Sequence, residues 1–129
     1  MKVAAGIVVR CGEQFLFIRR RNEPFKGMLA LPGGFVEEDE TVEHAAVREL
    51  EEETSIPVSK CDLRLIGVFS RIDRDPRGRV ISIAFRCDLP QVIPGHAGSD
   101  ASEIIWLPRD KAKASGLAFD HAEIVQAVE

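Results

Sequence analysis

Apolar residues along the chain fall into short runs separated by polar turns, a pattern typical of strands. The run at 3–10 is apolar and rich in β-branched residues, which predicts a buried strand. The run at 14–20 carries large apolar side chains on both of its sides, so we expect both faces of that strand to be covered. Further strands are predicted at 63–69, 80–86 and 104–107, with a short apolar segment at 29–31.

One segment has the spacing of a long helix. Apolar and polar residues over 41–54 recur with helical spacing, and either Thr41 or Asp39 can serve as the N-cap. Proline, glycine and asparagine mark the segments between the elements as loops. These loops lie at 22–27, 70–78 and 90–102, and the last is long enough to suggest a function.

A second helix is predicted at the end of the chain, over 120–128, with Asp120 and Glu123 as a capping pair. Strands and helices are interleaved without a regular βαβ repeat. We therefore expect an α/β protein with a mixed sheet and helices on its faces. At 129 residues and 14.3 kDa, one domain spanning 1–129 is expected.

Composition excludes several classes of protein. With 45% hydrophobic and 29% charged residues, the chain is neither collagen, a coiled coil nor a disordered tail, and it has no apolar run of membrane-spanning length. The three cysteines, Cys11, Cys61 and Cys87, are far apart and form no C-x-x-C pair. This argues against a disulfide framework or a zinc site, favours a reducing cytoplasm, and makes each a candidate small buried residue.

The charge is unevenly distributed. The net charge is −4, but segment 37–53 holds nine acidic residues and one base, Arg48. The segment therefore carries −8 and the rest of the chain +4. A concentrated acidic patch on a mildly basic body suggests a cation site that faces an anionic ligand. The low isoelectric point argues against nucleic acid as a partner and leaves phosphate-bearing small molecules open.

The acidic helix places three carboxylates side by side. At about 100° per residue, Glu49, Glu52 and Glu53 share one arc of the helix, next to its apolar face. Like charges at this spacing, close to a helix C-terminus, repel each other and oppose the helix dipole. A solvated charged face is one interpretation. The other is a hard divalent cation, Mg²⁺ or Mn²⁺, which takes oxygen ligands. Gly33 and Gly34 before the helix favour the second, because glycine lets a backbone approach a metal closely.

Here the sequence resembles the Nudix hydrolase family. The family signature is Gly, five residues, Glu, seven residues, Arg-Glu, an aliphatic, any residue, Glu-Glu, any residue, Gly, and an aliphatic. The matching residues, all at the right spacing, are Gly34, Glu40, Arg48, Glu49, Leu50, Glu52, Glu53 and Ile56. Ser55 departs from the pattern, because it stands where the family has the glycine that ends the helix.

The resemblance implies an α/β/α sandwich with a central mixed sheet, and roles for the signature residues. It implies that metal is bound by Glu49, Glu52, Glu53 and the Gly34 carbonyl, while Arg48 and Glu40 pair to orient the helix. The implied activity is hydrolysis of a nucleoside diphosphate linked to another group, with Mg²⁺ or Mn²⁺ as cofactor. The candidates for the base that activates water are Glu52, Glu53 and, from the late loop, Asp100 or Glu103.

Three shorter segments, at 22–27, 74–78 and 117–121, resemble the ADP-ribose pyrophosphatase branch of the family. This implies ADP-ribose as substrate, split to AMP and ribose 5-phosphate. His121 is interpreted as a surface residue at a helix start, with a substrate contact as the alternative. The expected catalytic residues are Glu52, Glu53, Glu103 and Arg48. The expected substrate-binding residues are Arg19, Arg21, Phe25, Arg74, Arg77 and Phe119.

Two alternatives remain open. One is a house-cleaning nucleoside triphosphate pyrophosphatase. The other is a sensor that binds ADP-ribose without cleaving it. Such regulators usually carry a further DNA-binding domain, for which 129 residues leave no room, so we expect the enzyme. We also expect a cytoplasmic homodimer that contacts neither nucleic acid nor a membrane, with a small nucleotide as its partner.

Overall fold

The computed structural model describes residues 1–128, so residue 129 of the expected domain lies outside the described residues. The strands are β1 (Lys2–Cys11), β2 (Gln14–Arg20), β3 (Leu29–Ala30), β4 (Gly33–Phe35), β5 (Arg64–Phe69), β6 (Val80–Asp88) and β7 (Ala101–Pro108). The helices are α1 (Val42–Thr54), the short 3₁₀ helix η1 (Lys60–Asp62), α2 (Arg109–Ser115) and α3 (His121–Gln126).

Strand β1 organises a mixed sheet. It runs parallel to β6 along its length, pairs antiparallel with β4 at its start, and joins β2 antiparallel at its end. Beyond β6 lies β5, an edge strand, while β2 is flanked by β3 and β7. The expected mixed sheet is confirmed, and the pairing with β4 brings the Gly33-Gly34 segment against the centre of the sheet.

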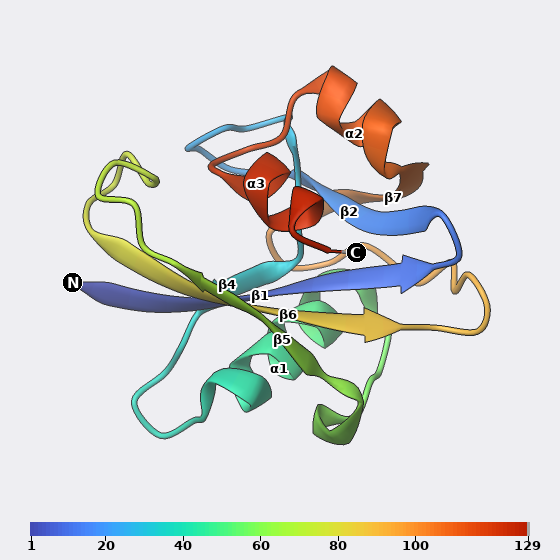
Figure 1. Ribbon diagram of the computed structural model, residues 1–129, viewed down its shortest axis with the longest axis horizontal. Helices are drawn as coiled ribbons and strands as arrows, with labels where there is room; N and C mark the ends of the chain where they lie inside the picture. The colour runs from blue at the N-terminus through green and yellow to red at the C-terminus, as the bar shows by residue number, and fades with distance from the viewer. Residues whose placement is uncertain (129) are drawn as a thin grey trace.

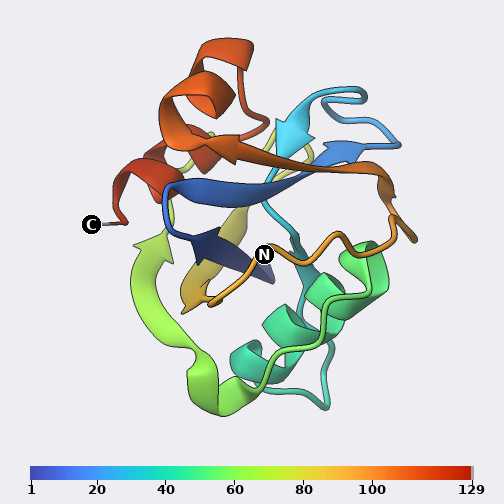
Figure 2. The same cartoon turned by 90° about the vertical axis from the view of Figure 1, so that its right-hand side faces the viewer.

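Helices cover both faces of this sheet. Helix α1 packs on one face, and α2 with α3 on the other, as two perpendicular views show (Figures 1 and 2). Alternate strand residues divide between the two layers: Leu16 packs in the cluster that contains Leu50 of α1, while Phe17 packs with Ile124 of α3. The prediction that β2 is covered on both faces is confirmed, and so is the α/β class with helices outside a mixed sheet.

The structure differs from the sequence predictions mainly after residue 100. Strand β7 begins at Ala101 rather than 104, and the sequence did not predict helix α2. The side chain of Asp120 makes no capping hydrogen bond to α3, because it pairs with Arg74 instead. The capping-pair prediction was therefore wrong.

The three cysteines differ in their exposure to solvent. All three cysteines are free, but only Cys87 is buried; Cys11 is half-buried and Cys61 exposed, so the expectation of three buried residues was wrong for two of them. Within residues 1–128, no helix is both long and apolar enough to cross a membrane.

Candidate active site

The start of α1 is fixed by a buried ion pair. Thr41 caps the helix by accepting a hydrogen bond from the backbone N–H of His44, so Thr41 rather than Asp39 is the N-cap. Glu40, just before the cap, accepts hydrogen bonds from Arg48 Nη2 at 2.6 Å and Arg48 Nε at 2.9 Å. These bonds lower the pKa of Glu40 to about 2, so its carboxylate stays charged in the buried position.

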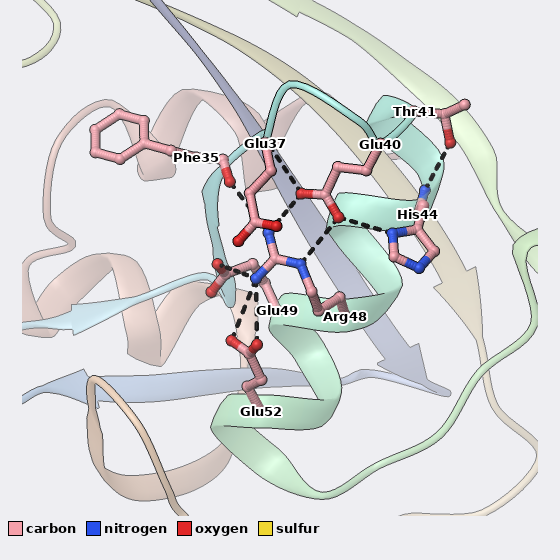
Figure 3. Close-up of polar contacts among 8 residues, drawn as sticks. All are labelled: Phe35, Glu37, Glu40, Thr41, His44, Arg48, Glu49 and Glu52. Atoms are coloured by element: carbon pink, nitrogen blue, oxygen red, sulfur yellow. Dashed lines mark hydrogen bonds and ion pairs between the residues drawn. The ribbon is translucent and has the colours of Figure 1, made fainter.

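The same guanidinium reaches two more carboxylates of the helix, those of Glu49 and Glu52 (Figure 3). Arg48 Nη1 donates to Glu49 at 2.9 Å and lies 3.2 Å from Glu52 Oε1, while Nη2 donates to the carbonyl of Phe35 in β4. Arg48 therefore ties α1 to β4 and partly neutralises the acidic helix. The pairing of Arg48 with Glu40 that the resemblance implied is present in this geometry.

The end of α1 keeps a left-handed cap although glycine is absent. Ser55 has φ 60° and ψ 20°, and its N–H donates to the carbonyl of Glu51. Loop residues satisfy the next carbonyls: His96 N–H donates to Thr54 and Gly98 N–H to Glu53. The long loop at 90–100 therefore caps the helix that carries the carboxylates.

Two of these carboxylates lie against the Gly33-Gly34 segment. Glu53, only 2% exposed, accepts a hydrogen bond from Gly33 N–H at 2.9 Å. A Cβ at Gly34 would lie 2.5 Å from the Glu49 carboxylate, so any larger residue at this position would displace that carboxylate from the Gly33-Gly34 segment. Burial, with the charges of Glu49 and Asp100, raises the pKa of Glu53 to about 8, and burial also raises the pKa of Glu49.

This donor set fits a divalent cation in its chemistry. Glu53 is buried and Glu49 is half-buried. Because both resist ionisation, they would gain most from a bound cation, which favours their charged forms. Glu52 is more open, with a side chain 45% exposed, and it pairs with Arg48. Within residues 1–128, no three Asp, Glu, His or Cys side chains are arranged as a complete set of metal ligands. A third carboxylate for a cation held by Glu49 and Glu53 would come from Glu52 or from Asp100, whose charge also raises the pKa of both carboxyls.

The raised pKa of Glu53 predicts an unusual pH dependence of stability. The folded protein retains this proton up to about pH 8, whereas the unfolded chain loses it near the ordinary value of 4.5. Stability of the metal-free protein should therefore fall as pH rises, by about 1–2 kcal/mol between pH 6.5 and 8. Urea unfolding in EDTA measures this. Glu53→Gln should remove the decline, and a wild-type stability that is flat or rising over this window would contradict the prediction.

A cavity of about 340 Å³ opens beside these carboxylates. Glu49, Glu53 and Asp100 line its acidic side, and Arg20 and Arg77 line its basic side. Its aromatic walls include Phe35 and Phe119, and His121 also lines it. The cavity therefore combines a candidate cation site, positive charge and flat apolar surface, which are the features that a nucleotide diphosphate requires.

Two of the cavity arginines, Arg20 and Arg77, are held over aromatic rings. Arg77 lies 5.0 Å from the centre of Phe35 and 5.5 Å from that of Phe119, and Asp75 accepts two hydrogen bonds from its guanidinium. Arg20 lies 5.0 Å from Phe119 and donates to the carbonyl of Pro24. Burial and the neighbouring charge of Arg77 lower the pKa of Arg20. Arg77 is paired with Asp75, whereas Arg20 forms no ion pair within residues 1–128.

Several residues predicted to bind substrate lie outside the cavity lining. Arg19 pairs with Glu103 at 2.8 Å, and Arg21 donates to the carbonyl of Ala101. The ring of Phe25 packs edge-on against the ring of Phe119, with ring centres 4.7 Å apart. The other predicted residues, Arg74, Arg77 and Phe119, do line the cavity.

From the run of three arginines at 19–21, sequence reasoning selected Arg19 and Arg21, whereas Arg20 is the one that lines the cavity; it also placed His121 at the surface. Strand alternation separates Arg20 from Arg19 and Arg21, but that pattern does not reveal which side faces the ligand. Asp75, in the segment that resembled ADP-ribose enzymes, also lines the cavity and holds Arg77.

Comparison with known proteins identifies the family. Residues 1–128 match the NUDIX domain. An ADP-ribose pyrophosphatase of Methanocaldococcus jannaschii is 50% identical over 127 residues, covering 96% of this chain and 70% of that protein. An ADPR responsive transcriptional repressor of Acinetobacter baylyi is 34% identical, covering 88% of this chain and 45% of that protein.

A solved structure agrees with this assignment. The bifunctional NMN adenylyltransferase/ADP ribose pyrophosphatase of Francisella tularensis, complexed with AMP and a Mn ion, is 29% identical with a TM-score of 0.83. The alignment covers 97% of this chain and 40% of that one, so this chain spans less than half the length of both the bifunctional enzyme and the repressor. Together with the match over 1–128, these likenesses show that the chain belongs to the Nudix family and has the fold of its pyrophosphohydrolases.

Proposed function

We propose that the protein hydrolyses ADP-ribose to AMP and ribose 5-phosphate, with Mg²⁺ or Mn²⁺ as cofactor. The observation that carries the proposal is a single cavity that joins the carboxylates of α1 to Arg20, Arg77 and an aromatic wall. The identity of 50% to an ADP-ribose pyrophosphatase supports the choice of substrate.

The residues divide the chemistry among them. Glu49, Glu52, Glu53 and the Gly34 carbonyl would hold the cation, which neutralises diphosphate oxygens and activates water. Arg48, fixed by Glu40, holds the carboxylates in place when the site is empty. Arg20 and Arg77 would bind the remaining phosphate charge, and Phe119 offers a face for a base or sugar.

The proton of the attacking water needs a carboxylate acceptor inside the cavity. Glu53 lines the cavity and has a pKa near 8, which is high enough to hold a proton at neutral pH when no cation is bound. Glu103 lies on the outer surface paired with Arg19, whereas Asp100, three residues earlier, lines the cavity. Glu52, the other predicted candidate on the helix, is not among the residues that line the cavity. We therefore place the base at Glu53 or Asp100.

The sensor is the second candidate, because the chain is also 34% identical to an ADPR responsive repressor. A sensor needs the cavity but not the acidic helix. Glu49 and Glu53 lie close against the Gly33-Gly34 segment, which is the arrangement that a cation-dependent enzyme needs, so the geometry favours an enzyme.

We further propose that the protein is a cytoplasmic homodimer. Its three free cysteines suit a reducing compartment, and the edge strand β5 exposes Leu65 and Val68, which could pair with a second copy.

A product assay tests the proposed substrate. With Mg²⁺ present, ADP-ribose, NADH, diadenosine polyphosphates and a panel of dNTPs are offered at equal concentration. We expect AMP from ADP-ribose to be released at least about tenfold faster than any other product, because the chain is 50% identical to an ADP-ribose pyrophosphatase and its arginines and aromatic wall suit a nucleoside diphosphate. A preference for a dNTP would support the triphosphate pyrophosphatase. ADP-ribose binding without any product would support the sensor.

A further inference from the structure

The imidazole of His121 is held in one tautomer. The backbone N–H of Leu31 lies 2.9 Å from His121 Nδ1. Because a backbone N–H can only donate, Nδ1 accepts this bond and the ring hydrogen resides on Nε2. Burial also lowers the pKa of His121 to about 4, so the ring is neutral at pH 7 and presents one N–H donor.

That donor is open to the cavity. His121 lines the cavity together with Glu53, Arg20 and Arg77. Within residues 1–128, Nε2 has no hydrogen-bond partner. In the same residues, the only side-chain nitrogen or oxygen that is both shielded from solvent and unpaired is Arg86 Nε, so Nε2 of His121 is accessible to solvent. An unpaired N–H that faces an open polar cavity is available to a ligand oxygen.

The surroundings of the ring keep the donor in a fixed direction. The preceding residue, Asp120, forms a two-point ion pair with Arg74, at 2.9 and 2.6 Å. Phe119 lies against the ring, with centres 5.3 Å apart. The bond from Leu31 anchors the opposite side of the imidazole to the segment that leads into Gly33. A donor held this rigidly loses little entropy when it binds a ligand.

We propose that His121 Nε2–H donates a hydrogen bond to an oxygen of the bound substrate, and that His121 is thereby a substrate-contacting residue. The proposal rests on the proposed function only in requiring a nucleotide in this cavity. Diphosphate and ribose oxygens share the necessary acceptor chemistry. Arg20 and Arg77 carry positive charge, whereas the neutral His121 ring offers one directional hydrogen bond. His121 therefore recognises the position of a ligand oxygen, and the arginines recognise the negative charge of the ligand.

Two substitutions separate the contact from the support that His121 gives to Leu31. His121→Asn can place its amide oxygen near the Nδ1 position and keep the Leu31 bond, but it is too short to donate from the Nε2 position. His121→Gln reaches the Nε2 position and leaves the Leu31 N–H unpaired. We expect His121→Asn to lower kcat/KM for ADP-ribose about tenfold with Tm near that of the wild type. His121→Gln should lower Tm and keep more of the activity.

Comparing ADP with ADP-ribose shows which substrate oxygen accepts the hydrogen bond from His121. A matching rise in the inhibition constant of ADP for His121→Asn would place the donor on the nucleotide diphosphate, and a loss confined to ADP-ribose would place it on the second ribose. If kcat/KM and the ADP inhibition constant of His121→Asn both stay within twofold of wild type, the proposal is wrong. If the wild type does not hydrolyse ADP-ribose, the proposed function fails by itself. ADP-ribose affinity measured by calorimetry in Mg²⁺ then decides, with an unchanged value for His121→Asn overturning the contact.

Discussion

Glu53→Gln is expected to lower kcat for ADP-ribose by about 10²–10⁴-fold. The substitution keeps the size of the side chain and an oxygen that can accept from Gly33 N–H. It removes the negative charge that would bind the cation or accept the proton of water. Because the carboxyl already resists ionisation in the metal-free fold, the neutral amide should leave Tm at pH 8 unchanged or higher. Steady-state kinetics in Mg²⁺ and thermal unfolding in EDTA measure the two effects.

Glu51→Gln is the matched control for this substitution. Glu51 lies on the same helix two residues earlier, but its side chain is exposed and outside the cavity lining. Its loss should change kcat by less than about twofold, since an exposed charge has little effect at this distance. Turnover by Glu53→Gln within tenfold of wild type would show that neither cation binding nor water activation depends on this carboxylate.

The acidic helix was predictable because its geometry is local. Residues three and four apart on a helix lie side by side, so the grouping of Glu49, Glu52 and Glu53 follows from spacing alone. The Glu40–Arg48 contact also lies within one helix and its cap. What spacing could not reveal is that Glu53 is buried while Glu52 is exposed, because this depends on how closely β4 approaches the helix.

The substrate side of the cavity was harder to predict because it is assembled from distant segments. Arg20, Arg77 and Phe119 come from a strand, a loop and the turn before α3. The alternation of side chains along a strand predicts that Arg20 lies on the opposite face from its neighbours. Which of the two faces meets the cavity depends on how the whole sheet packs. The segments that resembled ADP-ribose enzymes identified the loop of Arg77 and the ring of Phe119, whereas the arginine of β2 needed the structure.

Helix α2 and the pairing of Asp120 show the limits of local signals. Helix α2 buries only Ala112 within its seven residues, so it has almost no apolar periodicity to detect. Asp120 followed by Glu123 is a typical capping pattern, yet a buried arginine 46 residues away competes for the carboxylate. A charged hydrogen bond that is shielded from water is stronger than a cap to a short helix, so the tertiary contact prevails.

Breaking the Arg74–Asp120 pair is expected to have the largest effect on stability. The two side chains are 4% and 1% exposed, and they join the 70–78 loop to the start of α3 through two hydrogen bonds. Arg74→Met would leave the Asp120 carboxylate buried without its partner. We expect the free energy of unfolding in urea to fall by about 3–5 kcal/mol. Because the same loop carries Arg77, KM for ADP-ribose should also rise in the folded variant.

The chain offers a matched pair that joins the same two elements. Arg71 in this loop contacts Glu123 in α3, but these side chains are 53% and 55% exposed. Arg71→Met should lower the free energy of unfolding far less than Arg74→Met does, because water and salt screen an exposed pair. Equal losses for Arg71→Met and Arg74→Met would contradict the argument from burial. If Arg74 instead acts mainly by touching substrate, Arg74→Met would raise KM strongly while its unfolding curve stayed close to that of the wild type.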